Sequence, residues 1–150
     1  MARRVFFIFH YQRDLWRANV VRNIGAVEGV AAAGFHDSSL WDETKRRGES
    51  AVKKLINQGL NESTVTVVLI GAETANRSNV NYEVERSVAR GNGILGIRIN
   101  NIKDKDGRTD PPGEVPNALV KIGAPIYTWE YGKLGDWVEE AYKKAKSKPQ

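Results

Sequence analysis

The stretch Val5-Phe6-Phe7-Ile8-Phe9 is apolar at every position. A strand with one face in water alternates apolar and polar side chains, so a run without alternation is typical of a strand buried on both faces. A second run, from Ser63 to Gly71, is rich in β-branched residues and ends at a glycine. Strands of this kind belong to parallel sheets covered by helices. The two runs therefore predict neighbouring strands at the centre of a parallel sheet.

Helical patterns and further strands alternate along the rest of the chain. Trp16, Val20, Ile24 and Val27 stand at helical spacing within residues 14–28, which predicts a crossover helix. Further helices are expected from Ser39 to Gly59, over 79–90 and over 134–145, and strands over 29–37, 94–99 and 126–129, with a long surface loop over 100–116. We expect an α/β, flavodoxin-like fold with a parallel sheet of about five strands, ordered 2-1-3-4-5, and helices on both faces.

Composition narrows the class of protein. A chain of 150 residues with 41% hydrophobic and 27% charged residues predicts a single globular domain over 1–150. The absence of cysteine excludes disulfides and thiolate chemistry, and two histidines are too few for a histidine metal cluster, so we expect no metal. No apolar run reaches the roughly 20 residues of a membrane helix, and the first residues lack a signal-peptide pattern. We expect a cytoplasmic protein that does not bind membranes.

The net charge of +5 raises the hypothesis of nucleic-acid binding. Basic and acidic residues are interleaved, however, which favours solvated helix faces, so we expect no nucleic-acid partner. Neither a P-loop motif nor a G-x-G-x-x-G after the first strand is present. A receiver domain would carry a phosphate-accepting aspartate at the end of the third strand, where this chain has Leu69-Ile70-Gly71.

In a doubly wound sheet, ligands bind at the carboxyl ends of the strands where the winding reverses. This rule places His10-Tyr11-Gln12 and residues 71–78 at the crevice. Glu83 lies about one turn into the following helix if Ser78 or Asn79 is its N-cap, so its carboxylate could face the crevice. The same spacing fits a carboxylate that only complements the helix dipole, and both interpretations stay open. Glu85 points elsewhere on this helix and is expected to be solvated.

Several segments resemble the bacterial TIR-like proteins of the Thoeris antiphage system. They are residues 4–12, 17–23, 39–41, 55–60, 67–71, 82–83 and 96–100, and the resemblance runs in order over 3–107. It implies a TIR fold and an enzyme that cleaves the nicotinamide–ribose bond of NAD⁺, which is a substrate and not a bound cofactor. It also implies that the remainder becomes an ADP-ribose-derived, cyclic messenger that activates an effector protein during phage infection.

The resemblance also implies roles for individual residues. Glu83 matches the glutamate of the TIR W-x-x-x-E pattern and is the implied catalytic residue, while Asn79 stands in place of the tryptophan. The loop after the first strand and the segment from Asp37 to Trp41 would line the nucleotide pocket. The implied substrate-binding residues are Phe9, His10, Tyr11, Asp37, Ser39, Trp41 and Asn79.

One alternative from another functional class stays open. A TIR domain without turnover could act as an interaction module that associates with itself or with an effector. In the first strand, Ile8 stands where a serine is common, and with Asn79 it is one of two departures from the family pattern. The sequence does not indicate which ADP-ribose isomer would form, what triggers activity, or the oligomeric state.

Overall fold

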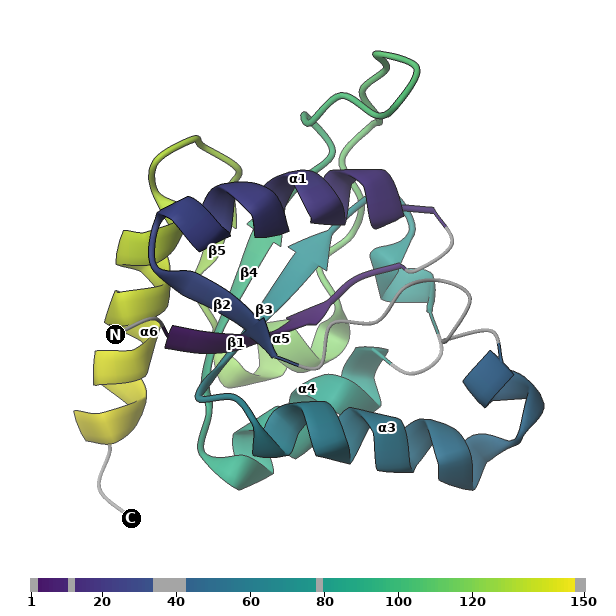
Figure 1. Ribbon diagram of the computed structural model, residues 1–150, viewed down its shortest axis with the longest axis vertical. Coiled ribbons are helices and arrows are strands. Elements are labelled where there is room, and N and C mark those ends of the chain that lie inside the picture. Colours follow the sequence, from purple (N-terminus) through teal and green to yellow (C-terminus); the bar gives the residue numbers. More distant parts are fainter. Residues whose placement is uncertain (1–2, 11–12, 34–42, 78–79, 148–150) are drawn as a thin grey trace.

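Five parallel strands form the centre of the molecule, with helices on both faces (Figure 1). The computed structural model describes residues 3–10, 13–33, 43–77 and 80–147. The strands are β1 (Arg3–Ile8), β2 (Val30–Ala33), β3 (Val65–Ile70), β4 (Gly93–Arg98) and β5 (Ile126–Thr128). The helices are α1 (Leu15–Val27), α3 (Glu49–Asn61), α4 (Val80–Arg90), α5 (Asn117–Ile122) and α6 (Leu134–Ser147), with a short 3₁₀ helix, η1 (Thr74–Asn76). The sheet order β2-β1-β3-β4-β5 confirms the predicted flavodoxin-like topology.

The helices form two layers around this sheet. Helices α1 and α6 lie on one face, and α3, α4 and α5 lie on the other (Figure 1). A close approach joins the first layer, because a Cβ atom at Gly25 of α1 would lie 2.9 Å from Cδ2 of Leu134 in α6. The longest helix within the described residues, α6, has 14 residues. No helix in that part of the chain is long and apolar enough to cross a membrane.

The two strands that predicted the fold are buried as expected. All six residues of β3 are buried, and so are Val5 to Ile8 of β1 and Phe9 after it. Parallel pairing places Val5 beside Val65 and Ile8 beside Val68, so the two apolar runs lie side by side. The one hydroxyl in β3, on Thr66, is satisfied by Ser87 of α4 at 2.9 Å. Each fully buried large aliphatic or aromatic side chain contributes about 1.5–3 kcal/mol of transfer free energy.

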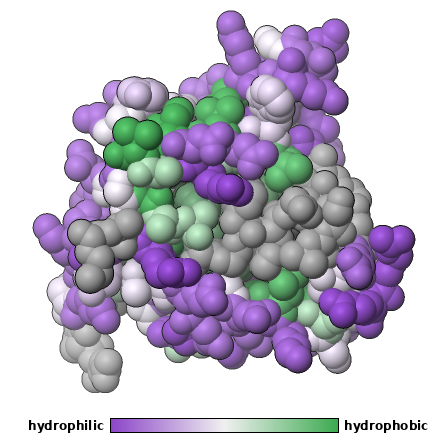
Figure 2. Space-filling view, in the orientation of Figure 1, coloured by the Kyte–Doolittle hydropathy of each residue, from purple (hydrophilic) through white to green (hydrophobic). Residues whose placement is uncertain are grey.

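The apolar spacing that predicted α1 does not mark its buried face. The side chains of Trp16 and Val27 are 53% and 87% exposed. The face that packs on the sheet instead carries Arg17, Ala18, Val21 and Gly25. The small residues allow a close approach to the sheet and to α6, and the buried arginine binds polar groups. In Figure 2, hydrophobic side chains gather over part of α1, surrounded by hydrophilic ones.

The expected continuous helix from Ser39 to Gly59 was wrong. Residues 43–46 are helical, but α3 begins only at Glu49 and ends at Asn61. Gly48 between them has φ 107°, which a right-handed helix does not contain and which glycine adopts without steric cost. The expected start at Ser39 lies outside the described residues.

Helix α5 was not predicted. It has six residues, begins after Pro116, and ends at Gly123, whose φ of 65° is left-handed. Proline before a helix and glycine after it are a recognised start and stop signal. This signal is present in the sequence, but it stands at the end of a loop rich in turn-forming residues. It was therefore not recognised as the start of a helix.

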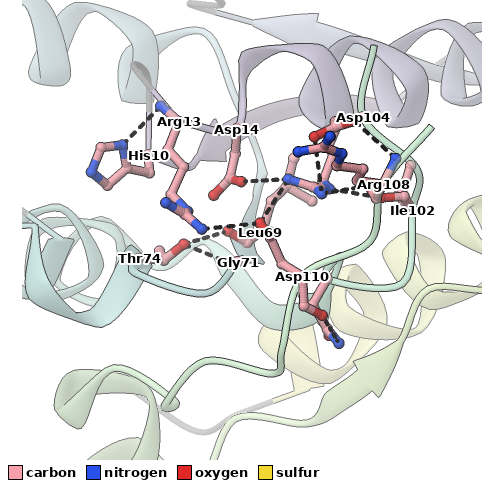
Figure 3. Close-up of polar contacts among 12 residues, drawn as sticks. His10, Arg13, Asp14, Leu69, Gly71, Thr74, Ile102, Asp104, Arg108 and Asp110 are labelled. Atoms are coloured by element: carbon pink, nitrogen blue, oxygen red, sulfur yellow. Dashed lines mark hydrogen bonds and ion pairs between the residues drawn. The ribbon is translucent and has the colours of Figure 1, made fainter. Parts of the chain in front are cut away.

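The long loop after β4, predicted over 100–116, is held by the buried guanidinium of Arg17. Its Nε donates to the carbonyl of Ile102 at 2.7 Å and its Nη2 to the carbonyl of Arg108 at 3.0 Å. Its Nη1 lies 2.9 Å from the Asp110 carboxylate and 3.4 Å from the Asp14 carboxylate. Figure 3 shows these carboxylates and carbonyls gathered at the start of α1. One side chain thus joins α1 to a loop far away in the sequence.

We expect Arg17→Ala to lower the free energy of unfolding by about 3–5 kcal/mol, because it leaves buried carboxylates and carbonyls without their cation. Arg22→Ala is the matched control on the same helix, where the arginine is exposed, and a surface substitution changes stability by about 0.5 kcal/mol. Urea denaturation of both variants measures the difference. Equal losses of stability would contradict the role given to Arg17.

Candidate functional site

The candidate site lies at the carboxyl ends of β1 and β3. These strands pair with each other, α1 follows β1 on one face of the sheet, and α4 follows β3 on the other (Figure 1). The winding therefore reverses between them, and ligands of such sheets bind at this point. Residues just after the two strands, and the start of α4, lie at this edge as the sequence predicts.

Glu83 lies in the first turn of α4 and is fully buried. Its Oε1 accepts a hydrogen bond from Nη2 of Arg77, which also forms an ion pair with it. Its Oε2 has no hydrogen-bond partner in the described part of the chain. Glu85, by contrast, is exposed, as predicted. The carboxylate thus points into the protein, with one oxygen held by Arg77 and the other buried without a partner among the described residues.

Two effects act on the pKa of Glu83 in opposite directions. Burial raises the pKa because a charged carboxylate loses its hydration, and this effect is the larger one. The charge and the hydrogen bond of Arg77 lower it. The pKa of Glu83 therefore lies above the ordinary value for glutamate, and Arg77 limits the rise.

The residues after β1 form a second polar group at the same edge. Nδ1 of His10 accepts the backbone N–H of Arg13 at 3.1 Å, so the neutral imidazole carries its proton on Nε2 (Figure 3). Asp14 is fully buried, and its Oδ2 has no hydrogen-bond partner among the described residues. Burial raises the pKa of this carboxyl, and the charge of Arg17 opposes the rise.

Gly71, directly after β3, makes room for the Asp14 carboxylate. A Cβ atom at Gly71 would lie 2.1 Å from Oδ2 of Asp14, a distance that no side chain can occupy. The backbone N–H of Gly71 donates to Oγ1 of Thr74 at 2.8 Å (Figure 3). This bond ties η1 to the end of β3, and η1 is followed directly by Arg77.

The structure describes three of the predicted site residues. Phe9 is buried at the end of β1, His10 is partly buried beside it, and Glu83 is buried in α4. Among the described residues no hydrogen bond or ion pair joins His10 to Glu83, although both lie at the same edge of the sheet. The other predicted residues, Tyr11, Asp37, Ser39, Trp41 and Asn79, lie outside the described residues.

Sequence reasoning missed Arg77 and Asp14. Arg77 lies within residues 71–78, which the topology places at the crevice. A positively charged residue at this position was the signal that could have identified Arg77 as part of the site. Asp14 stands where an N-cap is expected, yet its side chain makes no capping bond and turns inward instead. Nothing in its local spacing indicated that direction.

A cavity of about 520 Å³ lies at the opposite edge of the sheet, where β4 begins. Arg90, Gly93, Ile94, Tyr127 and Lys144 belong to its lining. None of the predicted site residues lies there, so this cavity is separate from the candidate site.

The fold and the buried Glu83 carboxylate at the switch point define a doubly wound α/β domain whose candidate site lies at the carboxyl ends of β1 and β3. A family model described as "Thoeris protein ThsB, TIR-like domain" matches residues 6–104. The chain is also similar to a Bacillus cereus (strain MSX-D12) protein named "Putative cyclic ADP-D-ribose synthase ThsB1". The two are 43% identical over 152 aligned residues, which cover 94% of this chain and 78% of the relative. The chain belongs to the Thoeris ThsB family of TIR-like domains.

Gly71→Ala is expected to lower the free energy of unfolding by about 1–3 kcal/mol, because the new methyl group would enter the space of the Asp14 carboxylate. The loss should be smaller in an Asp14→Ala background, where that space is free. Chemical denaturation of the wild type, both single variants and the double variant measures a coupling of about 0.5–3 kcal/mol. An equal cost of Gly71→Ala in both backgrounds would show that the two residues do not compete for this space.

Proposed function

We propose that this protein cleaves the nicotinamide–ribose bond of NAD⁺ and converts the remainder into a cyclic ADP-ribose signal, with Glu83 as the catalytic residue. Family membership and the name of the 43% identical relative support the reaction. The observation that supports the residue is the fully buried Glu83 carboxylate, with one oxygen held by Arg77 and the other without a partner among the described residues.

A half-satisfied buried carboxylate suits this chemistry. A buried polar atom without a partner costs about 1–3 kcal/mol, and more for a charged group, so Oε2 gains strongly from a hydroxyl donor or a positive charge. When the C1′–N bond of NAD⁺ breaks, its electron pair leaves with nicotinamide and positive charge develops on the ribose. A fixed anion beside the ring stabilises that state more than the ground state, because the charge appears only as the bond breaks.

No general acid is needed for this step. Nicotinamide leaves a cationic glycoside as a neutral molecule, so no proton has to be delivered to it. This requirement fits a buried glutamate at the start of α4 that acts by its charge and does not deliver a proton.

The second half of the reaction depends on which nucleophile reaches C1′. Attack by water gives ADP-ribose, whereas attack by an oxygen or nitrogen of the same nucleotide closes a ring and releases a proton. The shape of the pocket around the ribose decides between these two outcomes. The name of the relative specifies a cyclic product, which supports cyclisation.

The proposal includes the partners that the resemblance to Thoeris TIR-like proteins implies. The messenger would activate an effector protein, and enzyme, NAD⁺ and effector would share the cytoplasm. The residues proposed to bind substrate are Phe9, His10, Tyr11, Asp37, Ser39, Trp41 and Asn79.

A protein-interaction role is a second candidate, and the exposed apolar side chains of α1 favour it. Trp16 and Val27 are 53% and 87% exposed on a helix whose other face packs on the sheet. Such side chains could support self-association of TIR-like domains. Incubation of concentrated pure protein with NAD⁺ separates the two candidates, since an interaction module leaves the nucleotide unchanged.

We expect Glu83→Gln to lower the rate of nicotinamide release on the order of 10²–10³-fold, because the amide keeps the shape but not the charge. Glu85→Gln is the matched control on the same helix, where the glutamate is exposed, and it should retain the wild-type rate. Chromatography of NAD⁺, nicotinamide and the nucleotide products measures both variants, and circular dichroism checks folding. Unchanged release by folded Glu83→Gln would refute the catalytic role.

A further inference from the structure

We propose that Arg77 is a positioning residue of this site: its guanidinium fixes one oxygen of Glu83 and favours the ionised form of the carboxylate, so that the other oxygen can face the ribose. This inference rests on the proposed function. Arg77 acts through its effect on Glu83 and does not contact the reacting atoms.

The geometry holds the arginine as firmly as the carboxylate. The Arg77 side chain is 9% exposed and the Glu83 side chain 0% exposed, so the ion pair is shielded from water. The backbone N–H of Arg77 donates to the carbonyl of Thr74 at 3.1 Å. Thr74 in turn accepts the N–H of Gly71 and donates to the carbonyl of Leu69 at 3.3 Å. Arg77 is thus connected to the end of β3 by a short chain of hydrogen bonds.

The Glu83 carboxyl has one charged neighbour in the part of the chain that the structure describes. Only the charge and the hydrogen bond of Arg77 act on its ionisation there, in opposition to burial. The other charged groups near this edge of the sheet are directed elsewhere. His10 accepts from the Arg13 backbone, and Asp14 and Asp110 face the guanidinium of Arg17. No charge from β1 or α1 therefore substitutes for Arg77.

A purely structural role explains this pair less well. Two charges lose their hydration when they are buried, and hydrophobic residues of similar volume often stabilise a fold as well or better. A catalytic carboxylate, however, has to be ionised in order to stabilise a cation. Without an adjacent cation, a glutamate this deeply buried takes up a proton and becomes neutral.

The test compares Arg77→Gln and Arg77→Lys with the wild type by two measurements. The first is a ¹³C NMR titration of the Glu83 carboxyl, assigned by the loss of its signal in Glu83→Gln; it needs no turnover. The second is the pH profile of nicotinamide release. Arg86→Gln is the matched control, because Arg86 is an exposed arginine of α4 that bonds to Asn57 and not to Glu83.

In Arg77→Gln, the pKa of Glu83 should rise by at least about one unit, because the opposing charge is gone. The acidic limb of the pH profile should move up by the same amount, so that release falls about tenfold or more below the new pKa and recovers at higher pH. Arg77→Lys keeps a charge with weaker geometry and should give an intermediate shift. Arg86→Gln should leave both measurements unchanged.

An unchanged pKa of Glu83 in Arg77→Gln, or a loss of release that is equal at every pH, would overturn the proposal and leave Arg77 as a structural residue. If Arg77→Gln does not fold, the titration of Arg77→Lys decides alone, and an unchanged pKa overturns the proposal. Full release by folded Glu83→Gln would refute the catalytic role of Glu83 and with it the positioning role of Arg77, whereas NAD⁺ left intact by the wild type would refute the proposed function; in that case the NMR titration still shows whether Arg77 lowers the pKa of Glu83.

Discussion

The burial of the Glu83 carboxyl beside Arg77 is the constraint on which the proposed function depends. Glu83 lies inside the protein because α4 begins directly at the carboxyl edge of a sheet whose central strand, β3, is buried throughout. An ion at such a position costs several kcal/mol of hydration free energy unless a counter-charge and hydrogen bonds replace the water. Arg77 replaces part of this hydration by its charge and by a hydrogen bond to Oε1, and Oε2 has no partner among the described residues. The proposed function depends on this unpartnered oxygen.

The same edge of the sheet is organised by a second buried cation. Arg17 binds the loop after β4 and faces Asp14, and Asp14 occupies the space that Gly71 leaves open. These contacts fix the segments that follow β1 and β3 relative to each other. Reactive groups in loops need such a rigid support, because a small displacement of a catalytic group lowers its effect. Two arginines, Arg17 and Arg77, therefore hold this edge of the sheet, and neither belongs to the apolar pattern that predicted the fold.

Much of the fold could be predicted because its two central strands can be recognised from short, continuous stretches of sequence. Five consecutive apolar residues from Val5 to Phe9 indicate burial on both faces without knowledge of the partners. The location of the site was predicted from topology, and the match to the glutamate of the TIR W-x-x-x-E pattern singled out Glu83, because helix spacing alone left two interpretations open. The strand order is confirmed, and Glu83 is buried in the first turn of α4. The catalytic role of Glu83 stays a prediction.

The features that could not be predicted depend on tertiary contacts. The buried face of α1 contains Arg17, because carbonyls and a carboxylate from a loop far away in the sequence bind its guanidinium. The spacing of apolar residues along α1 gives no indication of these partners. The break at Gly48 depends on a backbone angle that a glycine permits but does not require. The pairing of Arg77 with Glu83 joins residues six positions apart, of which only Glu83 lies in α4, so spacing alone does not show that their side chains meet.

A crystal structure of Glu83→Gln with NAD⁺ bound tests the central claim most directly, because the inactive variant should keep the substrate intact. The account predicts a ribose hydroxyl of the nicotinamide half within about 2.6–3.2 Å of the side chain of residue 83, on the side away from Arg77. A nicotinamide ribose bound at a distance from this side chain, with the carboxyl edge of β1 and β3 empty, would contradict it.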